Sequence, residues 1–139
     1  MLFAFWWGAL GAIGAVVVPL LFRSLEVKAL AGGVAQSLFV WSTQLSLVCA
    51  SLSVVCAVWV RSRPAKGSGA NKRTVLLLGL LALLVSACML WGIIPQIKAG
   101  ENRALWHALG SLAFVLMWLL SGALLIQDAK RCFKSALPS

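Results

Sequence analysis

Charged side chains are scarce in this sequence, and their scarcity limits what kind of protein it can encode. Only 11% of the 139 residues are Asp, Glu, Lys or Arg, whereas 62% are hydrophobic, and the mean hydropathy is +0.99. A soluble domain of this length leaves a large share of its surface in water, so it has no place for so many apolar side chains. The composition therefore excludes an ordinary soluble domain and indicates an integral membrane protein.

Acidic residues are the rarest charged type, and the usual catalytic motifs are absent. The chain has three carboxylates, Glu26, Glu101 and Asp128, and it contains no glycine-rich phosphate loop, no HExxH motif and no CxxC pair. The chain therefore offers no pair of carboxylates for an acid–base mechanism, and we expect that the protein is not an enzyme. Ion-coupled transporters usually hold a charged residue at membrane depth. The long apolar runs of this chain hold none, which disfavours ion-coupled transport.

Four runs without any charged residue set the architecture. An α-helix needs about 20 apolar residues to cross the hydrocarbon core, so each run allows one crossing. The runs are residues 1–22, 29–60, 74–97 and 104–127. The sequence predicts one domain over residues 1–139, an all-α integral membrane four-helix bundle of two hairpins.

The second run is too long for a single crossing, because 32 helical residues extend about 48 Å. We expect its helix to begin near Gln36, and residues 29–35, with their Gly-Gly pair, to form a turn or an interfacial segment. Residues 61–73 form a basic connection and residues 128–139 a tail. The predicted helices span about residues 2–22, 36–60, 74–97 and 104–127.

Basic residues are unevenly distributed, and their distribution gives the orientation. The net charge is +9, and eight of the twelve basic residues lie in the 61–73 connection and the 128–139 tail. The positive-inside rule places both segments, and hence both termini, in the cytoplasm. We expect these residues to contact anionic lipid headgroups. Nucleic acid is not an expected partner, because the segment "RSRPAKGSGANKR" has no aromatic side chain among its charges.

The N-terminal run has the features of a retained membrane helix. It lacks the basic start of a signal peptide, and its apolar stretch is too long for one. Trp6 and Trp7 lie beside the N-terminus, where we expect the pair to anchor the helix at the membrane interface. Pro19 and Pro95 lie at matching places near the ends of the first and third helices, which raises the hypothesis of an internal two-fold repeat.

Small residues indicate where the helices pack. Gly8 and Gly11 recur at helical spacing on the first predicted helix, Gly79 lies on the third and Gly110 on the fourth. Small side chains let neighbouring backbones approach closely in a membrane. We expect these glycines to serve packing within the bundle. The alternative is a surface for a second copy of the chain, as a homo-oligomer, or for another membrane protein.

The only histidine, His107, lies three residues into the fourth predicted helix and follows Trp106. An interfacial Trp-His pair has one apolar and one wet face, and we expect Gln96, Glu101 and Arg103 to accompany it in a polar cluster. Haem or metal binding through His107 is a sharper alternative, but a bis-histidine haem needs a second histidine. We therefore expect no cofactor and no metal centre.

Gln44 is the most polar residue inside the second predicted helix, with Thr43 and Ser46 close by. A buried amide in a membrane needs a partner on a facing helix, so we expect Gln44 to tie two helices together. The functional alternative places Gln44 in the wall of a small polar cavity that opens outward beside His107.

Three stretches carry a resemblance to a known family: "WWGALGAIGAVVVPLLFRSL", "ALAGGVAQSLF" and "LWHALGS". With them the chain resembles the bacterial branch of a transmembrane-protein-205-like family, whose domain is described only as domain of unknown function 4149. The resemblance implies a multi-pass, four-helix protein of the bacterial cytoplasmic (inner) membrane, without an established biochemical activity. The residues that carry it are Trp7, Gly8, Pro19, Leu20, Phe22, Ala31, Gly32, Phe39, Trp106, His107, Gly110 and Ser111.

Three functions follow from these patterns. The leading one is a non-enzymatic structural or partner-binding membrane protein, because the apolar interior holds no catalytic constellation. The second is a small permease-like or ligand-binding bundle with an outward polar site formed by Gln44, Gln96 and His107. The third is a haem- or metal-binding redox protein that uses His107. The architecture is similar to copper-resistance and porphyrinogen-oxidase families, but those need further histidines or a membrane lysine, which this chain lacks.

Overall fold

The computed structural model describes residues 1–62, 69–100 and 102–136, and within them the chain forms four helical rods and no strand. The first rod consists of α1 (Leu2–Ala12), a π-helical turn (Ile13–Val17) and α2 (Val18–Ser24). The second rod is α3 (Lys28–Ser62). The third consists of α4 (Gly69–Ala87), a second π-helical turn (Cys88–Ile93) and α5 (Ile94–Ala99), and the fourth is α6 (Arg103–Ala136).

Each rod is long and apolar enough to cross a membrane. Large apolar side chains such as Trp41 and Leu112 point outward from the bundle, which suits contact with lipid rather than with water. The candidate spans are Leu2–Ser24, Lys28–Trp59, Arg73–Ala99 and Ala104–Lys130. The predicted all-α four-helix membrane bundle is confirmed, and the chain is a multi-pass membrane protein.

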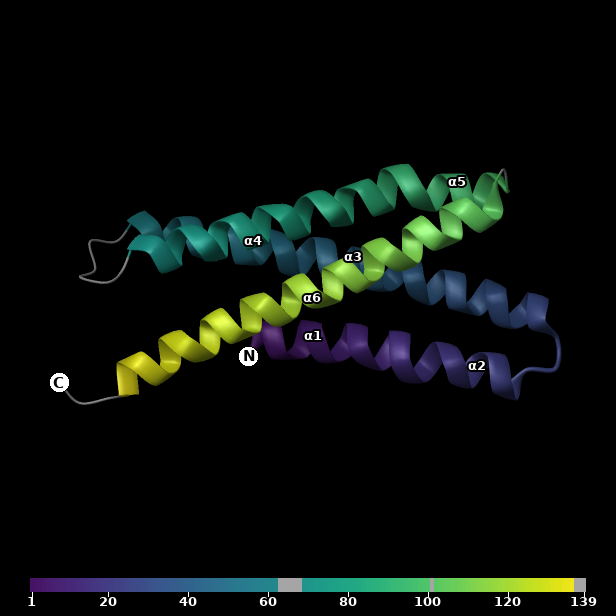
Figure 1. The fold of residues 1–139 in the computed structure, drawn as a ribbon, viewed down its shortest axis with the longest axis horizontal. Coiled ribbons are helices and arrows are strands. Elements are labelled where there is room, and N and C mark those ends of the chain that lie inside the picture. Colours follow the sequence, from purple (N-terminus) through teal and green to yellow (C-terminus); the bar gives the residue numbers. More distant parts are fainter. Residues whose placement is uncertain (63–68, 101, 137–139) are drawn as a thin grey trace.

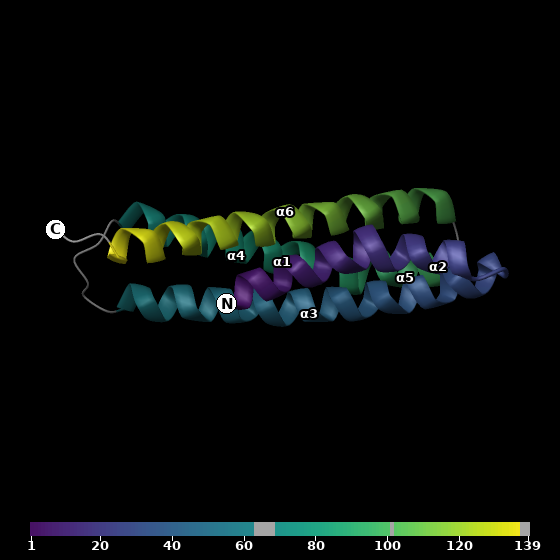
Figure 2. The ribbon, with the colours of Figure 1, turned by 90° about the horizontal axis from the view of Figure 1, so that it is seen from below.

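The rods form two antiparallel hairpins whose connections, after α2 and after α5, lie at the same end of the bundle (Figures 1 and 2). We call this the proline end, because Pro19 and Pro95 lie near it. Along the bundle α3 packs on α4, and α6 packs on both α1 and α4. Toward the proline end α6 runs to α5 and separates from α2 (Figure 1).

Serine hydroxyls are distributed through the buried core. Each donates a hydrogen bond of 2.7–2.9 Å to a carbonyl of its own helix three or four residues earlier. The hydroxyls are thereby satisfied without water, and their small size leaves room for large neighbours such as Leu10, Met89 and Met117. These serines are Ser42, Ser46, Ser53, Ser86 and Ser121.

Trp6 is a core residue and not the interfacial anchor that the sequence suggested. Its side chain is fully buried, and its Nε1 donates a hydrogen bond to Ser46 Oγ on α3 at 3.0 Å. Ser46 supplies the acceptor that an indole N–H needs away from water. The partly exposed Trp7 stacks on Trp118 of α6, with ring centroids 5.5 Å apart. We expected Gln44 to tie α3 to another helix; the described tie between α3 and the first rod is made by Ser46.

The helices are longer than the sequence suggested. Residues 29–35, which we expected to form a turn or an interfacial segment, are helical and belong to α3, which begins at Lys28, so they do not form a turn. A helix pairs its backbone groups internally, which outweighs the cost of about 1 kcal/mol for each glycine of the Gly-Gly pair. α6 continues to Ala136, so residues 128–136 of the expected tail are helical. The expected 61–73 connection is shortened from both sides by α3 and α4, and its residues 63–68 lie outside the described residues.

A π-helical turn precedes each of the two prolines. Pro19 and Pro95 have no backbone N–H to donate, so the carbonyl groups of Ala15 and Trp91 lack their usual helical donor. The π-helical turns Ile13–Val17 and Cys88–Ile93 end just before these prolines. The two hairpins share this feature at matching positions, which agrees with the hypothesis of an internal repeat.

Candidate functional site

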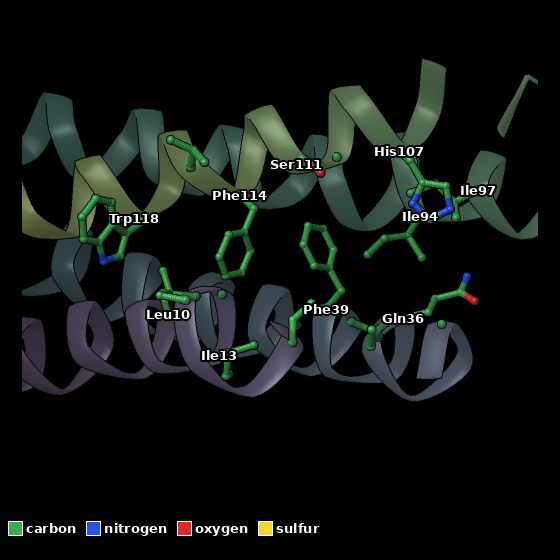
Figure 3. A pocket seen from close by; sticks show the side chains of 18 of the residues that line it. Leu10, Ile13, Gln36, Phe39, Ile94, Ile97, His107, Ser111, Phe114 and Trp118 are labelled. Atoms are coloured by element: carbon green, nitrogen blue, oxygen red, sulfur yellow. The ribbon is translucent and has the colours of Figure 1, made fainter. Parts of the chain in front are cut away.

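A cavity of about 580 Å³ lies where α6 separates from the first rod, near the proline end (Figure 3). The first rod forms one wall, α6 forms the opposite wall, and α3 with α5 closes the back. Rim residues such as Ala15 and Val115 are exposed, so the cavity is a groove open to the surroundings of the bundle. Its lining includes Leu10, Gly11, Ile13, Gly14, Ala15, Val18, Phe22, Gly32, Ala35, Gln36, Phe39, Val40, Ile94, Ile97, His107, Gly110, Ser111, Phe114, Val115 and Trp118.

Glycines of the first rod allow the aromatic side chains of α6 to lie close to it. A Cβ at Gly14 would lie 2.8 Å from Phe114 Cε1, and a Cβ at Gly11 would lie 3.1 Å from Trp118 Nε1. Phe114 in turn stacks on Phe39 of α3, with ring centroids 4.9 Å apart. Figure 3 shows these two rings facing each other midway between Trp118 and His107. Any occupant of the groove lies alongside them.

The groove is polar at one end and apolar along the rest of its length. His107, Gln36 and Ser111 lie toward the proline end. From there to Trp118 the lining is made of aliphatic, glycine and phenylalanine residues. His107 and Trp118 are eleven residues apart on α6, which is about 16 Å along the helix axis. At the far end Trp118 Nε1 is buried and has no hydrogen-bond partner among the described residues.

The family model for the domain of unknown function DUF4149 matches residues 1–104. The chain belongs to this family. The match covers the first three rods and therefore one wall and the back of the groove, but not the opposite wall formed by α6. It ends before α6 supplies Trp106, His107, Gly110 and Ser111, which the sequence resemblance had included. No curated protein and no solved structure gives a significant match to the chain.

Of the polar residues that the sequence suggested for a site in this DUF4149 protein, the structure places three, and only one of these lines the groove. His107 lines the groove, but Gln44 and Gln96 are exposed and do not line it. Glu101 and the side chain of Arg103 lie outside what the structure describes. Among the described residues, the polar side chains that line the groove together with His107 are Gln36 and Ser111.

Gln36 and Ser111 were missed for an identifiable reason. We treated Gln36 as the first residue of a helix, whereas it lies two turns inside α3, on the same face as Gly32 and Phe39. Ser111 lies four residues after His107, which is one helical turn. The spacing of three and four residues along α3 and α6 is the signal that could have revealed this face.

Three of the four glycines chosen from the sequence lie at helix contacts. A Cβ at Gly79 would lie 2.8 Å from Ser53 Oγ and one at Gly110 would lie 3.4 Å from Ile97 Cδ1, while Gly11 contacts Trp118. Gly8 differs, because it is exposed and a Cβ there would meet nothing within 4 Å. Gly8 therefore does not serve packing within this chain.

Metal-ligating side chains do not gather in the part of the family member that the structure describes. No group of three or more His, Cys, Asp or Glu residues there lies close enough to hold one ion. His107 faces an apolar wall that includes Ile94 and Ile97 (Figure 3). The arrangement at His107 suits hydrogen bonding to a polar group at the mouth of the groove.

Proposed function

We propose that this protein is a non-enzymatic, multi-pass protein of the bacterial cytoplasmic membrane that binds a single-chain amphiphile in the groove between the first rod and α6. The single observation that carries the proposal is the shape of the lining, polar near His107 and apolar from there to Trp118. With both termini in the cytoplasm, as the basic residues indicate, the proline end faces outward. The polar mouth then lies toward the outer headgroups, and basic residues at the other end contact anionic lipid.

The length of the groove supports an acyl chain as its occupant. The hydrocarbon core of a bilayer is about 30 Å thick, so one leaflet contributes about 15 Å. The groove extends about 16 Å from His107 to Trp118 along α6, which matches one chain of one leaflet. A polar head at the mouth can accept hydrogen bonds from Gln36 or Ser111. It can also accept a hydrogen bond from one ring nitrogen of His107 or donate one to the other.

Selectivity in such a site has to come from the head and from the fit of the chain. Moving an acyl chain from lipid into an apolar groove changes its solvent little, so burial alone contributes no strong driving force. The polar contacts at His107 and the shape set by Gly14 and the Phe39–Phe114 pair therefore decide which amphiphile binds.

Binding rather than chemistry is favoured by the composition of the groove. His107 is the one titratable side chain among its described lining residues. General acid–base catalysis needs a proton carrier within reach of the reacting group, and nucleophilic catalysis needs an activating base beside the nucleophile. The single imidazole beside Ser111 has no third group to orient it among these residues.

Filling the groove tests the proposal. Ala15→Leu places a larger side chain in the groove, and Ala12→Leu places the same side chain on the exposed side of the same rod, outside the lining. The purified proteins are incubated with palmitic acid in mild detergent, and native mass spectrometry counts the bound molecules. We expect one saturable adduct per wild-type and Ala12→Leu chain and a loss of that adduct in Ala15→Leu. Equal binding by all three would overturn the proposal.

A partner-binding role is a second proposal, and one observation favours it. Gln44 is exposed on α3 at membrane depth and does not line the groove. Lipid tails offer such an amide no hydrogen-bond partner, so this surface suits a protein partner within the membrane.

A further inference from the structure

Gln44 is an amide on the outside of the bundle. The nearby polar residues of α3 face inward: Thr43 donates a hydrogen bond to Phe39 O at 2.8 Å, and Ser46 accepts one from Trp6. Gln44 is exposed instead, and no hydrogen bond joins its side chain to any residue that the structure describes. Its two N–H donors and its carbonyl acceptor are therefore presented to the surroundings of α3.

The depth of Gln44 excludes water as its partner. Gln44 lies 16 residues after Lys28 and 17 before Arg61, the nearest charged residues of α3, which is about 24 and 26 Å along the axis. A hydrocarbon core of about 30 Å placed anywhere between these two charges contains Gln44. The amide consequently lies in a region where neither water nor lipid can satisfy it.

We infer that Gln44 marks a contact surface where α3 packs against α3 of a second copy of this chain. An amide carries donors and an acceptor, so two Gln44 side chains related by a two-fold axis can bond reciprocally. This self-complementarity favours a second copy over an unrelated helix. The inference is independent of the amphiphile, because Gln44 does not line the groove.

The residues around Gln44 have the spacing of a helix–helix contact. Trp41, Val48, Leu52 and Val55 are all exposed on α3, and together with Gln44 they follow one another at intervals of three or four residues. This is the spacing of a seam between two packed helices. α6 carries a stripe at similar spacing that is apolar throughout, which lipid alone can cover; it consists of Leu105, Leu109, Leu112, Leu116 and Leu119.

Association in vesicles tests this surface. The full chain is labelled, reconstituted into phosphatidylcholine–phosphatidylglycerol vesicles at decreasing protein density, and counted per complex by single-molecule photobleaching. We expect wild type to form dimers and Gln44→Leu to raise the dissociation constant about tenfold, equivalent to about 1.4 kcal/mol. Gln44→Asn keeps the amide and should retain most of the pairing. Leu112→Ala, on the exposed face of α6, is the matched control and should behave as wild type.

Disulfide cross-linking gives a second readout, which does not depend on a variant that could weaken the fold. In a chain without its native cysteines, Val48→Cys should form cross-linked dimers, whereas Leu112→Cys should not. A wild type that is monomeric at every density, or dimers that Gln44→Leu leaves unchanged, would overturn the inference. A complex with a different protein in place of the second copy would overturn it as well.

Discussion

At the scale of single residues, the direction in which a polar side chain faces decides its role. Gln44 and Ser46 are two residues apart, so they point about 200° apart around α3. The inward one, Ser46, bonds Trp6, and the outward one has no partner within the described chain. The sequence places both at membrane depth but does not say which faces the core, because polar and apolar residues are mixed around them, with Ser42 and Thr43 directly before Gln44. The predicted tie therefore fell on the wrong one of the two.

The Trp6–Ser46 hydrogen bond gives the first prediction. Ser46→Ala leaves Trp6 Nε1 buried without an acceptor, so we expect a loss of about 1–3 kcal/mol in the free energy of unfolding. Reversible unfolding in mixed micelles measures it. Ser37→Ala is the control, because Ser37 is exposed and bonds only Gly33 O of its own helix. An equal effect of both changes would show that the Trp6 bond contributes nothing.

At the scale of helices, the contact between α3 and α4 is set by Gly79. Gly79 has no Cβ, and side-chain atoms of α3 lie close to where one would be: Ser53 Oγ at 2.8 Å and Val54 Cγ2 at 3.1 Å. Small residues were recognisable in the sequence as packing positions, and Gly79 confirms that reasoning. Gly8 was also predicted to be a packing position, but a Cβ there would meet no neighbour within 4 Å. The spacing of glycines along a helix does not tell which of them contacts another helix. Helix ends were equally hard to place, because α3 continues through its two glycines.

The second prediction concerns this contact. Gly79→Leu forces α3 and α4 apart, and we expect a loss of about 1–3 kcal/mol in the free energy of unfolding, as is usual for overpacking. Gly33→Leu places the same side chain where a Cβ meets nothing within 4 Å and should leave that free energy nearly unchanged. Unfolding in mixed micelles compares the two. A Gly79→Leu protein as stable as Gly33→Leu would contradict the close approach of the two helices.

At the scale of the whole molecule, the sequence predicted the four-helix membrane bundle, but it offered a cavity beside His107 only as an alternative, with Gln44 and Gln96 in its wall, and neither of these lines the groove. Four long charge-free runs determine the number of crossings, because charge is costly in hydrocarbon. The groove arises from the separation of α6 from α2 (Figure 1), and such a separation depends on tertiary packing that no local pattern records. His107 was identified as a residue of interest, but Gln36 and Ser111 became recognisable as its companions only in the folded structure, where α3 and α6 line the same groove.

Orientation gives the third prediction. With both termini in the cytoplasm, Ser24→Cys at the proline end should react with a membrane-impermeant maleimide added to intact cells. Phe133→Cys, exposed near the end of α6, should react only after the cells are opened. Both are made in a chain without its native cysteines. The reverse pattern would place the mouth of the groove toward the cytoplasm.

Photo-cross-linking with a diazirine-bearing fatty acid tests the central claim, that the groove holds an acyl chain. The labelled peptides of the wild-type protein in its membrane are mapped by mass spectrometry. We predict that label concentrates on groove residues such as Phe39, Phe114 and Val115 and is displaced by an excess of palmitic acid. Label spread evenly over lipid-facing residues such as Leu112 and Leu119, and not displaced by palmitic acid, would contradict the account.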